Sequence, residues 1–549
     1  MKKEIQKIIK NAIRSAFGVD FELEKIKVDY APEGMGDYSS NIALVLAKQV
    51  GKSPMEVAEE LALAISEGST FGAPKVEPSA ELQFQKIEAA KPGFLNFWLA
   101  DAALRNVAEN INKEKNDYGK SETGSGKKVH LDFVSANPTG PIHVGNARGG
   151  PLGDTLANVF SKVGYDPYRE YYVNDAGNQV EVLGHSILGD DQAQYAGQYI
   201  ENLKSEILNL KSSEGFDRQN PRQVGDKGLE IILEKIIKPS MEKFGIKFDN
   251  YFSEKEMQTS GKVDEAIEIL KEKNLICEKD GAQWFKSTQF GDDKDRVVVK
   301  SDGQKTYFGS DIAYHKEKFD RGFEKIIDIW GADHHGEVAR TKGAFAALGY
   351  PDKLEFILTQ FVRVVKDGKE VKMSKRAGTY VSIDDLVEEV GRDATRFFFL
   401  MHSADTHMSF DLSLAKEQSE KNPVFYVQYA HARISSILRK AEGIFSEGST
   451  FGAPKVEPSG MHPKERALIF ELLKFPDLVE EISGNYAAHH LPQYAISLAD
   501  KFHSFYDQCR VIDEGDLETT VWRLEIVKAT QIVLAETLRL MGISAPEHM

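Results

Sequence analysis

The spacing of hydrophobic and polar residues divides the chain into four stretches. Residues 1–111 combine helical periodicity with two alternating runs around a Pro-Gly turn, which predicts a small α+β domain. Residues 112–128 are polar and rich in Gly, Ser and Lys, so we expect a linker. From residue 129 to 414, short apolar strands alternate with helical runs, which predicts an α/β domain with a parallel sheet. Residues 415–549 carry only helical periodicity and should form an all-α bundle.

Two segments interrupt this division. The interval from about 185 to 290 is charged and mostly helical in pattern, so we expect a helical insertion within the α/β domain. The segment SEGSTFGAPKVEPS occurs at 66–79 and again, letter for letter, at 446–459. It lacks the apolar face with which structural repeats pack, so we favour an inert insertion in surface loops over a shared binding loop.

Composition narrows the class of protein. The 549 residues are 41% apolar and 28% charged, as in globular proteins, and no apolar run is long enough to cross a bilayer. The N-terminal stretch is expected to be an amphipathic helix rather than a signal peptide. Two distant cysteines, Cys277 and Cys509, argue against a disulfide scaffold and a cysteine zinc site, so we expect a cytoplasmic protein without a protein-bound metal. The net charge of −16 says little about any one face.

The stretch PIHVGNARGG, residues 141–150, lies where the loop after the first predicted strand of the α/β domain becomes a helix. A helix N-terminus offers unpaired N–H groups to phosphate, and Gly145 permits close approach to the backbone. His143 and Asn146 can each donate a hydrogen bond to an anionic oxygen. By itself this stretch is also compatible with an ordinary glycine-rich helix start.

A second stretch, VKMSKRAGTY at 371–380, follows a long strand run. Its lysines, Lys372 and Lys375, are suited to clamping a polyphosphate and neutralising charge on departing pyrophosphate. The alternative is a solvated basic loop.

Together the two stretches resemble the two signatures of class I aminoacyl-tRNA synthetases, with Asn146 in place of a second histidine. The segments FVSANPTGPIHVGNARGG, YREYYVNDAGNQ, TYFGSDIAYHKEKF, IWGADHHG and YVQYAHARISSIL resemble arginyl-tRNA synthetases of bacterial type. This resemblance covers essentially the whole chain except the repeated segments. It implies a Rossmann-like catalytic domain with a helical insertion, a small α+β N-terminal domain and an all-α C-terminal bundle that reads the anticodon region.

The resemblance also implies roles for individual residues. The residues expected to bind arginine are Asp132, Ser135, Asn137, Glu254, Tyr307 and Asp311. Those expected to bind ATP are His143, Gly145, Asn146, Asp333, His334, Met373, Ser374 and Lys375, and those expected to act in catalysis are His143, Asn146, Lys372 and Lys375. Those expected to contact tRNA are Tyr426, Tyr429, His431 and Arg433. Ordinary alternatives remain, since an acidic residue at a helix start is often a cap and a tyrosine is often core.

The implied activity is that of an arginine–tRNA ligase using arginine, ATP with Mg²⁺, and tRNA(Arg), without a membrane and as a monomer. Other class I synthetases share both signatures, but the cysteinyl and methionyl enzymes often have zinc-binding cysteines and need no carboxylates for a guanidinium. A non-catalytic tRNA-binding paralogue would be expected to lose Asn137 or the signature lysines. A nucleotidylyltransferase would leave the terminal domains without a role.

Overall fold

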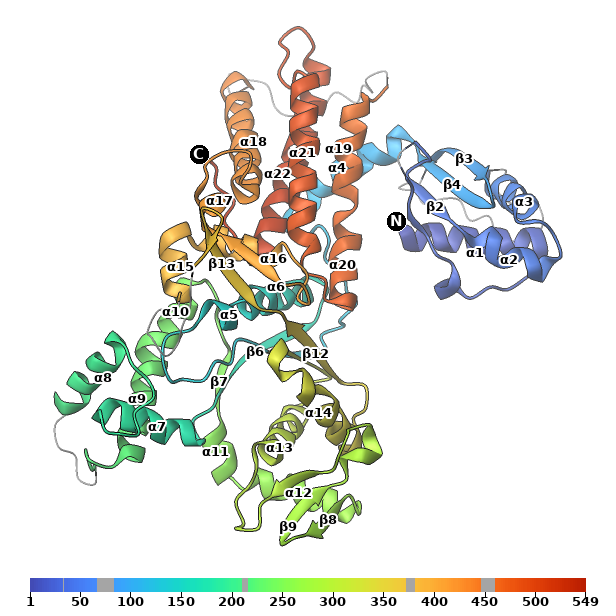
Figure 1. The fold of residues 1–549 in the computed structure, drawn as a ribbon. Coiled ribbons are helices and arrows are strands. Elements are labelled where there is room, and N and C mark those ends of the chain that lie inside the picture. Colours follow the sequence, from blue (N-terminus) through green and yellow to red (C-terminus); the bar gives the residue numbers. More distant parts are fainter. Residues whose placement is uncertain (33, 67–82, 210–215, 372–380, 446–459) are drawn as a thin grey trace.

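The computed structural model describes residues 1–549 except 33, 67–82, 210–215, 372–380 and 446–459. A four-stranded antiparallel sheet of order β1-β2-β4-β3, packed against helices, forms the N-terminal domain (Figure 1). Its elements are α1 (Lys2–Phe17), the 3₁₀ helix η1 (Leu23–Lys25), β1 (Asp29–Tyr30), β2 (Tyr38–Ser40), α2 (Ile42–Val50), α3 (Pro54–Ser66), β3 (Phe84–Ala90) and β4 (Phe94–Leu99). The strand pair around the Pro-Gly turn is β3 and β4.

A five-stranded parallel sheet of order β12-β11-β5-β6-β7 forms the centre of the molecule, which confirms the predicted α/β architecture. Its strands are β5 (Lys128–Asp132), β6 (Asp166–Val173), β7 (Asn250–Ser253), β11 (Lys325–Gly331) and β12 (Leu354–Thr359). The helices that connect or flank them are α5 (Val144–Ala147), α6 (Gly149–Lys162), α13 (Tyr307–Asp320), the 3₁₀ helix η5 (Ala332–His334) and α14 (His335–Leu348). Residue 153 is glycine because a Cβ there would lie 2.3 Å from the ring of Phe133, so a side chain would push α6 off the sheet.

The interval expected to be helical, about 185–290, contains strands as well. Its helical elements, with the neighbouring α7, are α7 (Asn178–Leu188), α8 (Gln198–Asn209), α9 (Pro221–Ile232), the π-helix η3 (Leu233–Ile237), α10 (Lys238–Lys243), α11 (Glu254–Thr259), α12 (Lys262–Glu272) and the 3₁₀ helix η4 (Ser287–Phe290). Between them, β7 joins the central sheet, and β8 (Ile276–Lys279) and β9 (Ala282–Phe285) pair with β10 (Arg296–Val299) in a small antiparallel sheet. This interval is therefore partly an extension of the central sheet.

A third small sheet, of order β14-β13-β15, lies between the central sheet and the C-terminal helices. Its strands are β13 (Val362–Lys366), β14 (Lys369–Glu370) and β15 (Met408–Asp411), and the accompanying helices are α15 (Ile383–Val390), α16 (Arg392–Leu400) and α17 (Leu412–Lys416). The C-terminal region is an all-α bundle, as predicted. Its helices are α18 (Pro423–Phe445), α19 (Pro463–Leu473), α20 (Phe475–Asn485), α21 (His490–Gln508) and α22 (Leu517–Leu540).

The interval expected to be a linker, 112–128, starts inside a helix and packs on the bundle. Helix α4 (Asp101–Glu114) and the 3₁₀ helix η2 (Lys115–Asp117) occupy its first part, and β5 begins at its last residue. The side-chain amide of Asn112 donates to the carbonyl oxygen of Glu525 on α22 at 3.0 Å, and Tyr118 stacks on Phe475. Asn112 and Tyr118 thus anchor the start of this interval on the bundle.

The central α/β domain and the bundle are joined by a buried arginine of α16. Arg396 has no exposed surface, and its Nε donates to the carbonyl oxygen of Met541 at 2.8 Å while its Nη2 pairs with Asp154 of α6 at 2.5 Å. Nearby, Lys162 near the end of α6 pairs with Glu536 of α22 at 2.8 Å. Helix α6, which follows the first motif, is therefore fixed to the C-terminal end of the bundle.

Candidate active site

The residues expected to bind substrates lie at the carboxyl edge of the parallel sheet. Strand β5 ends at Asp132, β7 ends one residue before Glu254, and β11 ends two residues before Asp333. The chain continues from β5 to β6 and β7 on one side and later adds β11 and β12 on the other, so the strand order switches beside β5. Open α/β sheets bind ligands in the crevice at such a switch point.

The first motif forms the start of α5. His143 is the N-cap residue, and its Nδ1 accepts a hydrogen bond of 2.9 Å from the backbone N–H of Gly145. With Nδ1 accepting, the ring carries a donor proton on Nε2. A Cβ at position 145 would lie 3.1 Å from this Nδ1, so glycine makes room for the cap as well as for a ligand. Asn146 lies in the first turn of α5 and is exposed.

Arg148, which the sequence analysis did not single out, anchors this loop. Its guanidinium is nearly fully buried and donates to the carbonyl oxygens of Gln360 at 2.6 Å and Ser403 at 2.9 Å. Burial lowers the pKa of Arg148 to about 10, with Asp405 opposing the shift. In the sequence, the only sign of this anchoring role is that Arg148 is a large charged residue among the small residues of 145–150.

The residues directly after the second motif form backbone hydrogen bonds with the first motif. The backbone N–H of Ile383 donates to the carbonyl oxygen of Ile142 at 2.9 Å, and that of Val144 donates to Val381 at 3.3 Å. Residues 372–380 of the second motif lie outside the described part of the chain, and they include Lys372, Met373, Ser374 and Lys375. Their roles stay predictions.

Asp132 is held by three donors. The hydroxyl of Ser135 donates to its Oδ1 at 2.5 Å, the hydroxyl of Tyr314 lies 2.9 Å from its Oδ2, and Lys318 Nζ lies 3.3 Å from the same oxygen. Ser135 has a φ of 36° and also accepts from the backbone N–H of Tyr172 at 3.0 Å, so it acts here as a support for Asp132. Asn137, expected to touch the amino acid, is exposed two residues further on.

Glu254 is a buried carboxyl group at the start of α11. Only 1% of its surface is exposed, and Gln258 Nε2 donates to its Oε1 at 2.9 Å. Burial raises the pKa of Glu254 to about 7; Asp175 and Asp311 add to the shift, and hydrogen bonds from Tyr172 and Gln258 oppose it. A half-protonated carboxyl group at neutral pH is suited to a cationic ligand that can displace the proton.

Asp311 and Tyr307 lie one turn apart on α13. One carboxylate oxygen of Asp311 lies 3.0 Å from the hydroxyl of Thr341, and the other lies 3.2 Å from His315 Nδ1, with 28% of the side chain exposed. Tyr307 is 63% exposed, so its ring is available to a ligand. The sequence analysis missed Tyr172. Burial raises the pKa of its phenol, and the nearby carboxylates of Glu254, Asp311 and Asp132 raise it further.

Asp333 and His334 form an exposed turn after β11. The Nδ1 of His334 lies 3.2 Å from Glu337, and this hydrogen bond, with Asp333 and Asp311, raises the pKa of His334. The influence of Asp311 links this turn to the carboxylates described above. Among the residues that the structure describes, no cluster of three His, Cys, Asp or Glu side chains is arranged to hold a metal ion.

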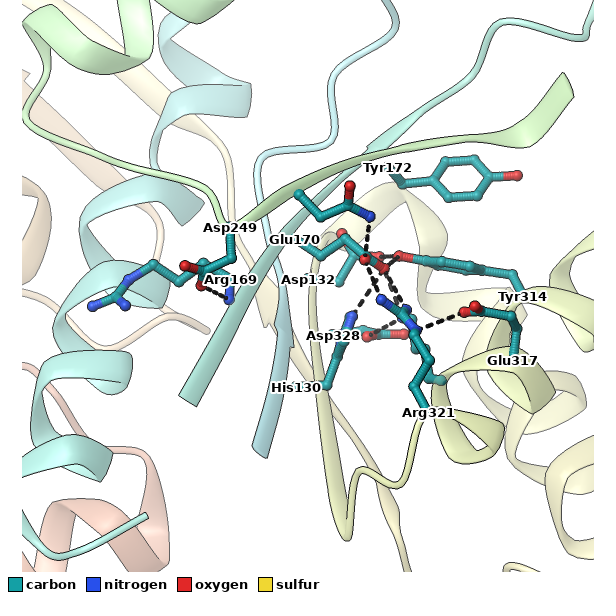
Figure 2. Close-up of polar contacts among 12 residues, drawn as sticks. His130, Asp132, Arg169, Glu170, Tyr172, Asp249, Tyr314, Glu317, Arg321 and Asp328 are labelled. Carbon is teal, nitrogen blue, oxygen red and sulfur yellow. Dashed lines mark hydrogen bonds and ion pairs between the residues drawn. The ribbon is translucent and has the colours of Figure 1, made fainter. Parts of the chain in front are cut away.

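Behind these residues lies a buried cluster around Glu170, shown in Figure 2. Arg321 forms a bidentate ion pair with its carboxylate at 2.7 and 2.9 Å, and His130 Nε2 lies 2.9 Å from Oε1. Burial alone would raise the pKa of Glu170, but the hydrogen bonds from His130 and Arg321 hold it well below its usual value. The hydroxyl of Tyr314 lies 2.8 Å from Glu170 and 2.9 Å from Asp132, so the cluster fixes Asp132 through this phenol. Sequence reasoning found none of these supports.

Comparison with known proteins matches this geometry to one family. Residues 107–411 match the model for the catalytic domain of class I (R) tRNA synthetases, 3–99 the arginyl tRNA synthetase N-terminal domain, and 427–549 the DALR anticodon binding domain. An arginine–tRNA ligase of Halalkalibacterium halodurans is 41% identical over 100% of this chain and 99% of its own length. The chain belongs to the arginyl-tRNA synthetase family.

Other relatives agree with this assignment. The arginine–tRNA ligase of Moorella thermoacetica is 44% identical over 94% of this chain and 92% of its own. The arginyl-tRNA synthetase structure from Thermus thermophilus shares the fold, with a TM-score of 0.75 at 23% identity over 100% of both chains. A methionyl-tRNA synthetase from Mycobacterium tuberculosis aligns at 12% identity with a TM-score of 0.53, over 76% of this chain and 91% of that one. The alternative of a different class I synthetase is therefore wrong, although the fold is shared.

In the C-terminal bundle of this synthetase, α18 and α21 bring aromatic rings together around Arg433. Its guanidinium lies 4.8 Å from the ring centroid of Tyr429 and 5.2 Å from that of Tyr506. The rings of Tyr426 and His503 are 4.9 Å apart. Three of the four residues expected to contact tRNA are thus neighbours, joined by His503 and Tyr506, which the sequence analysis missed because they lie on another helix.

His431, the fourth residue of that set, is arranged differently. It is 4% exposed, and its Nδ1 donates to the carbonyl oxygen of Pro546 in the C-terminal tail at 2.8 Å. Its ring therefore packs under the tail, where it cannot stack on a base without displacement of that tail.

Every helix in the described part of the chain is too short or too polar to span a bilayer.

Proposed function

We propose that this enzyme, an aminoacyl-tRNA ligase of the arginine family, joins arginine to tRNA(Arg) in two steps with the residue roles given below. One observation carries the proposal: Asp132 ends β5 and Glu254 directly follows β7 at one edge of the sheet, and the amide of Gln258 joins Glu254 to Ser310, the neighbour of Asp311. A substrate with a cation at each end matches this arrangement.

Arginine is bound through its two ends. Asp132, supported by Ser135, accepts from the α-amino group, and Asn137 lies on the adjoining loop. Asp311 and Glu254 accept from the guanidinium, with the exposed ring of Tyr307 beside it. The planar guanidinium can donate to two carboxylates at once, which an ammonium group cannot do with the same geometry.

ATP enters as the magnesium complex, with Mg²⁺ on the phosphates. His143 Nε2–H and the amide of Asn146 donate to phosphate oxygens at the start of α5, where Gly145 leaves the backbone open. We assign Asp333 and His334, which lie just after β11, to the nucleotide as well. The second motif completes the binding of ATP through Lys372, Met373, Ser374 and Lys375. This assignment rests on the sequence motif alone.

In the first step the arginine carboxylate attacks the α-phosphorus, a new P–O bond forms, and pyrophosphate leaves with the electrons of the broken P–O bond. The signature lysines neutralise its charge. In the second step a ribose hydroxyl of the tRNA 3′ end attacks the activated carbonyl, loses its proton, and AMP leaves. No nucleophile of the protein is required, so catalysis comes from positioning and charge stabilisation.

The remaining assignments concern tRNA and the assembly. The cluster of Tyr426, Tyr429 and Arg433 offers stacking surfaces to unpaired bases of the anticodon region, and His431 would join it only after displacement of the C-terminal tail. We assign 1–111 and 415–549 to tRNA contact and 129–414 to catalysis. We further propose that the enzyme acts as a cytoplasmic monomer.

The decisive experiment is pyrophosphate exchange into ATP with each amino acid, with and without total tRNA. Of all the amino acids, only arginine should support exchange, and the same preparation should attach arginine to tRNA. Exchange with lysine or cysteine but not with arginine would overturn the proposal.

A further inference from the structure

Two cationic side chains of α13 connect the carboxylates proposed to hold the two ends of arginine. Lys318 Nζ lies 3.3 Å from Asp132 Oδ2 and 2.8 Å from Asp328 Oδ1. His315 Nε2 lies 2.6 Å from the other oxygen of Asp328, and its Nδ1 lies 2.7 Å from the backbone carbonyl oxygen of Asp311 and 3.2 Å from its carboxylate Oδ1. Polar contacts therefore run without a break from the α-amino end of the site to the guanidinium end.

These connecting groups are all inside the protein. Lys318 and Asp328 have no exposed surface, and His315 is 1% exposed. Asp328 lies on β11 directly opposite Asp132 of β5 in the strand register, so two carboxylates occupy adjacent positions. Desolvation makes buried ion pairs weak stabilisers compared with apolar residues of the same volume, so stability gives little reason to maintain this arrangement.

The chain of contacts also determines how Asp311 is presented. His315 lies at one carboxylate oxygen and the hydroxyl of Thr341 at the other, which leaves the carboxylate one partly exposed side. Burial would lower the pKa of His315, but Asp311 and Asp328 raise it to about 9 against the opposing effect of Lys318. The imidazole is therefore a cation at neutral pH and can donate from both nitrogens.

We propose that Lys318, Asp328 and His315 form a positioning relay that sets the separation of the two substrate-binding carboxylates and so selects the length of the amino acid. The residues of the relay do not touch arginine; they act through Asp132 and Asp311. This inference rests on the proposed function, because it requires those two carboxylates to hold the substrate.

The test is the variant His315→Asn, assayed by pyrophosphate exchange with saturating tRNA. Removal of a charged hydrogen bond from Asp311 should raise the KM for arginine by about tenfold or more. The KM for ATP should stay within about twofold, since its proposed contacts lie on other loops. The preference for arginine over homoarginine, which is one methylene longer, should narrow because Asp311 is no longer fixed.

A merely structural role would give a different result. Loss of folded protein lowers the number of active sites, and hence the apparent kcat with both amino acids, but leaves the KM and the homoarginine discrimination unchanged. Unchanged KM and discrimination in folded His315→Asn would overturn the relay. If that variant does not fold, Asp328→Asn takes its place, because it keeps the volume and removes the charge that joins His315 to Lys318; unchanged KM and discrimination there would overturn the proposal equally.

Lys316→Met is the matched control. Lys316 lies on the same helix and pairs with Glu265 and Asp320, whose side chains are 60% and 52% exposed. This variant should match the unmodified enzyme in both KM values and in discrimination. Failure of the unmodified enzyme to activate arginine would refute the proposed function, whereas normal activation combined with an unaltered His315→Asn would refute only the relay.

Discussion

Proton-linked binding of arginine is the sharpest consequence of the buried Glu254. In the free enzyme the pKa of this carboxyl group is about 7. Arginine brings a guanidinium that stays charged at every accessible pH, so it binds the ionised carboxylate and displaces the proton. For a site that binds only the ionised form, the apparent Kd should rise about tenfold from pH 8 to pH 6, which corresponds to about 1.4 kcal/mol.

Calorimetry measures this linkage directly. Arginine binding at pH 7 in two buffers of different ionisation enthalpy should show release of roughly half a proton per site, because a group with a pKa near 7 is half protonated there. Glu254→Gln should release no proton from this site, and its Kd should change little between pH 6 and pH 8. Its affinity at pH 8 should be lower than that of the unmodified enzyme, since a carboxylate opposite the guanidinium has been lost.

His334 supplies the control, because its pKa is also raised and it lies within the influence of Asp311. His334→Asn should retain the proton release if Glu254 is its source. The reasoning would be refuted if Glu254→Gln kept the tenfold pH dependence, or if the unmodified enzyme bound arginine without releasing a proton.

Four further predictions follow from the site. Asp311→Asn should raise the KM for arginine about tenfold or more in pyrophosphate exchange with little change for ATP, and an unchanged value would make Asp311 structural. Asn146→His should raise the adenylation rate by less than about tenfold, near 1.4 kcal/mol of barrier, because this position needs a donor and not a cation; a larger gain would contradict that view. Arg433→Met should raise the KM for tRNA and not that for ATP, and an unaltered tRNA KM would place the aromatic cluster outside the RNA interface. Deletion of 66–79 and 446–459, most of which lies outside the described residues, should leave the turnover number within about twofold, and a large loss would favour a binding role.

Local sequence carried most of the information about the carboxyl edge of the sheet. The run that ends at Asp132 is a short apolar strand followed by a turn-rich loop, and the run before Asp333 has the same form. Because parallel strands bring their carboxyl ends to one edge, these residues could be grouped without knowledge of the strand order. The helical periodicity of residues 415–549 likewise led directly to the bundle.

The segments that were misjudged depend on pairing partners or contain a turn that was not weighed. Strand β7 is four residues long and is a strand only because β6 lies beside it. The hairpin of β8 and β9 turns at Asp280 and Gly281, both with positive φ. An Asp-Gly pair between two strand-like runs is a common hairpin signal. It was missed because the interval was judged by its overall charge and helical pattern. The supposed linker was judged by its polarity, whereas its first residues continue α4 and its Asn112 and Tyr118 pack on the bundle.

The buried relay could not be predicted for a more basic reason. Asp311, His315 and Lys318 recur at helical spacing along α13, and a polar stripe of that kind ordinarily faces solvent. Here the stripe faces the sheet, where Asp132 at the end of β5 and Asp328 within β11 pair with its cations, and Lys318 contacts Asp132 across 186 positions of sequence. The local rule fails where the strand ends carry charge, and active sites are the places where such failures are expected. A polar stripe on a helix next to a strand that carries a buried carboxylate, as α13 is next to β11, is therefore better interpreted as the support of a charged ligand than as a solvated face.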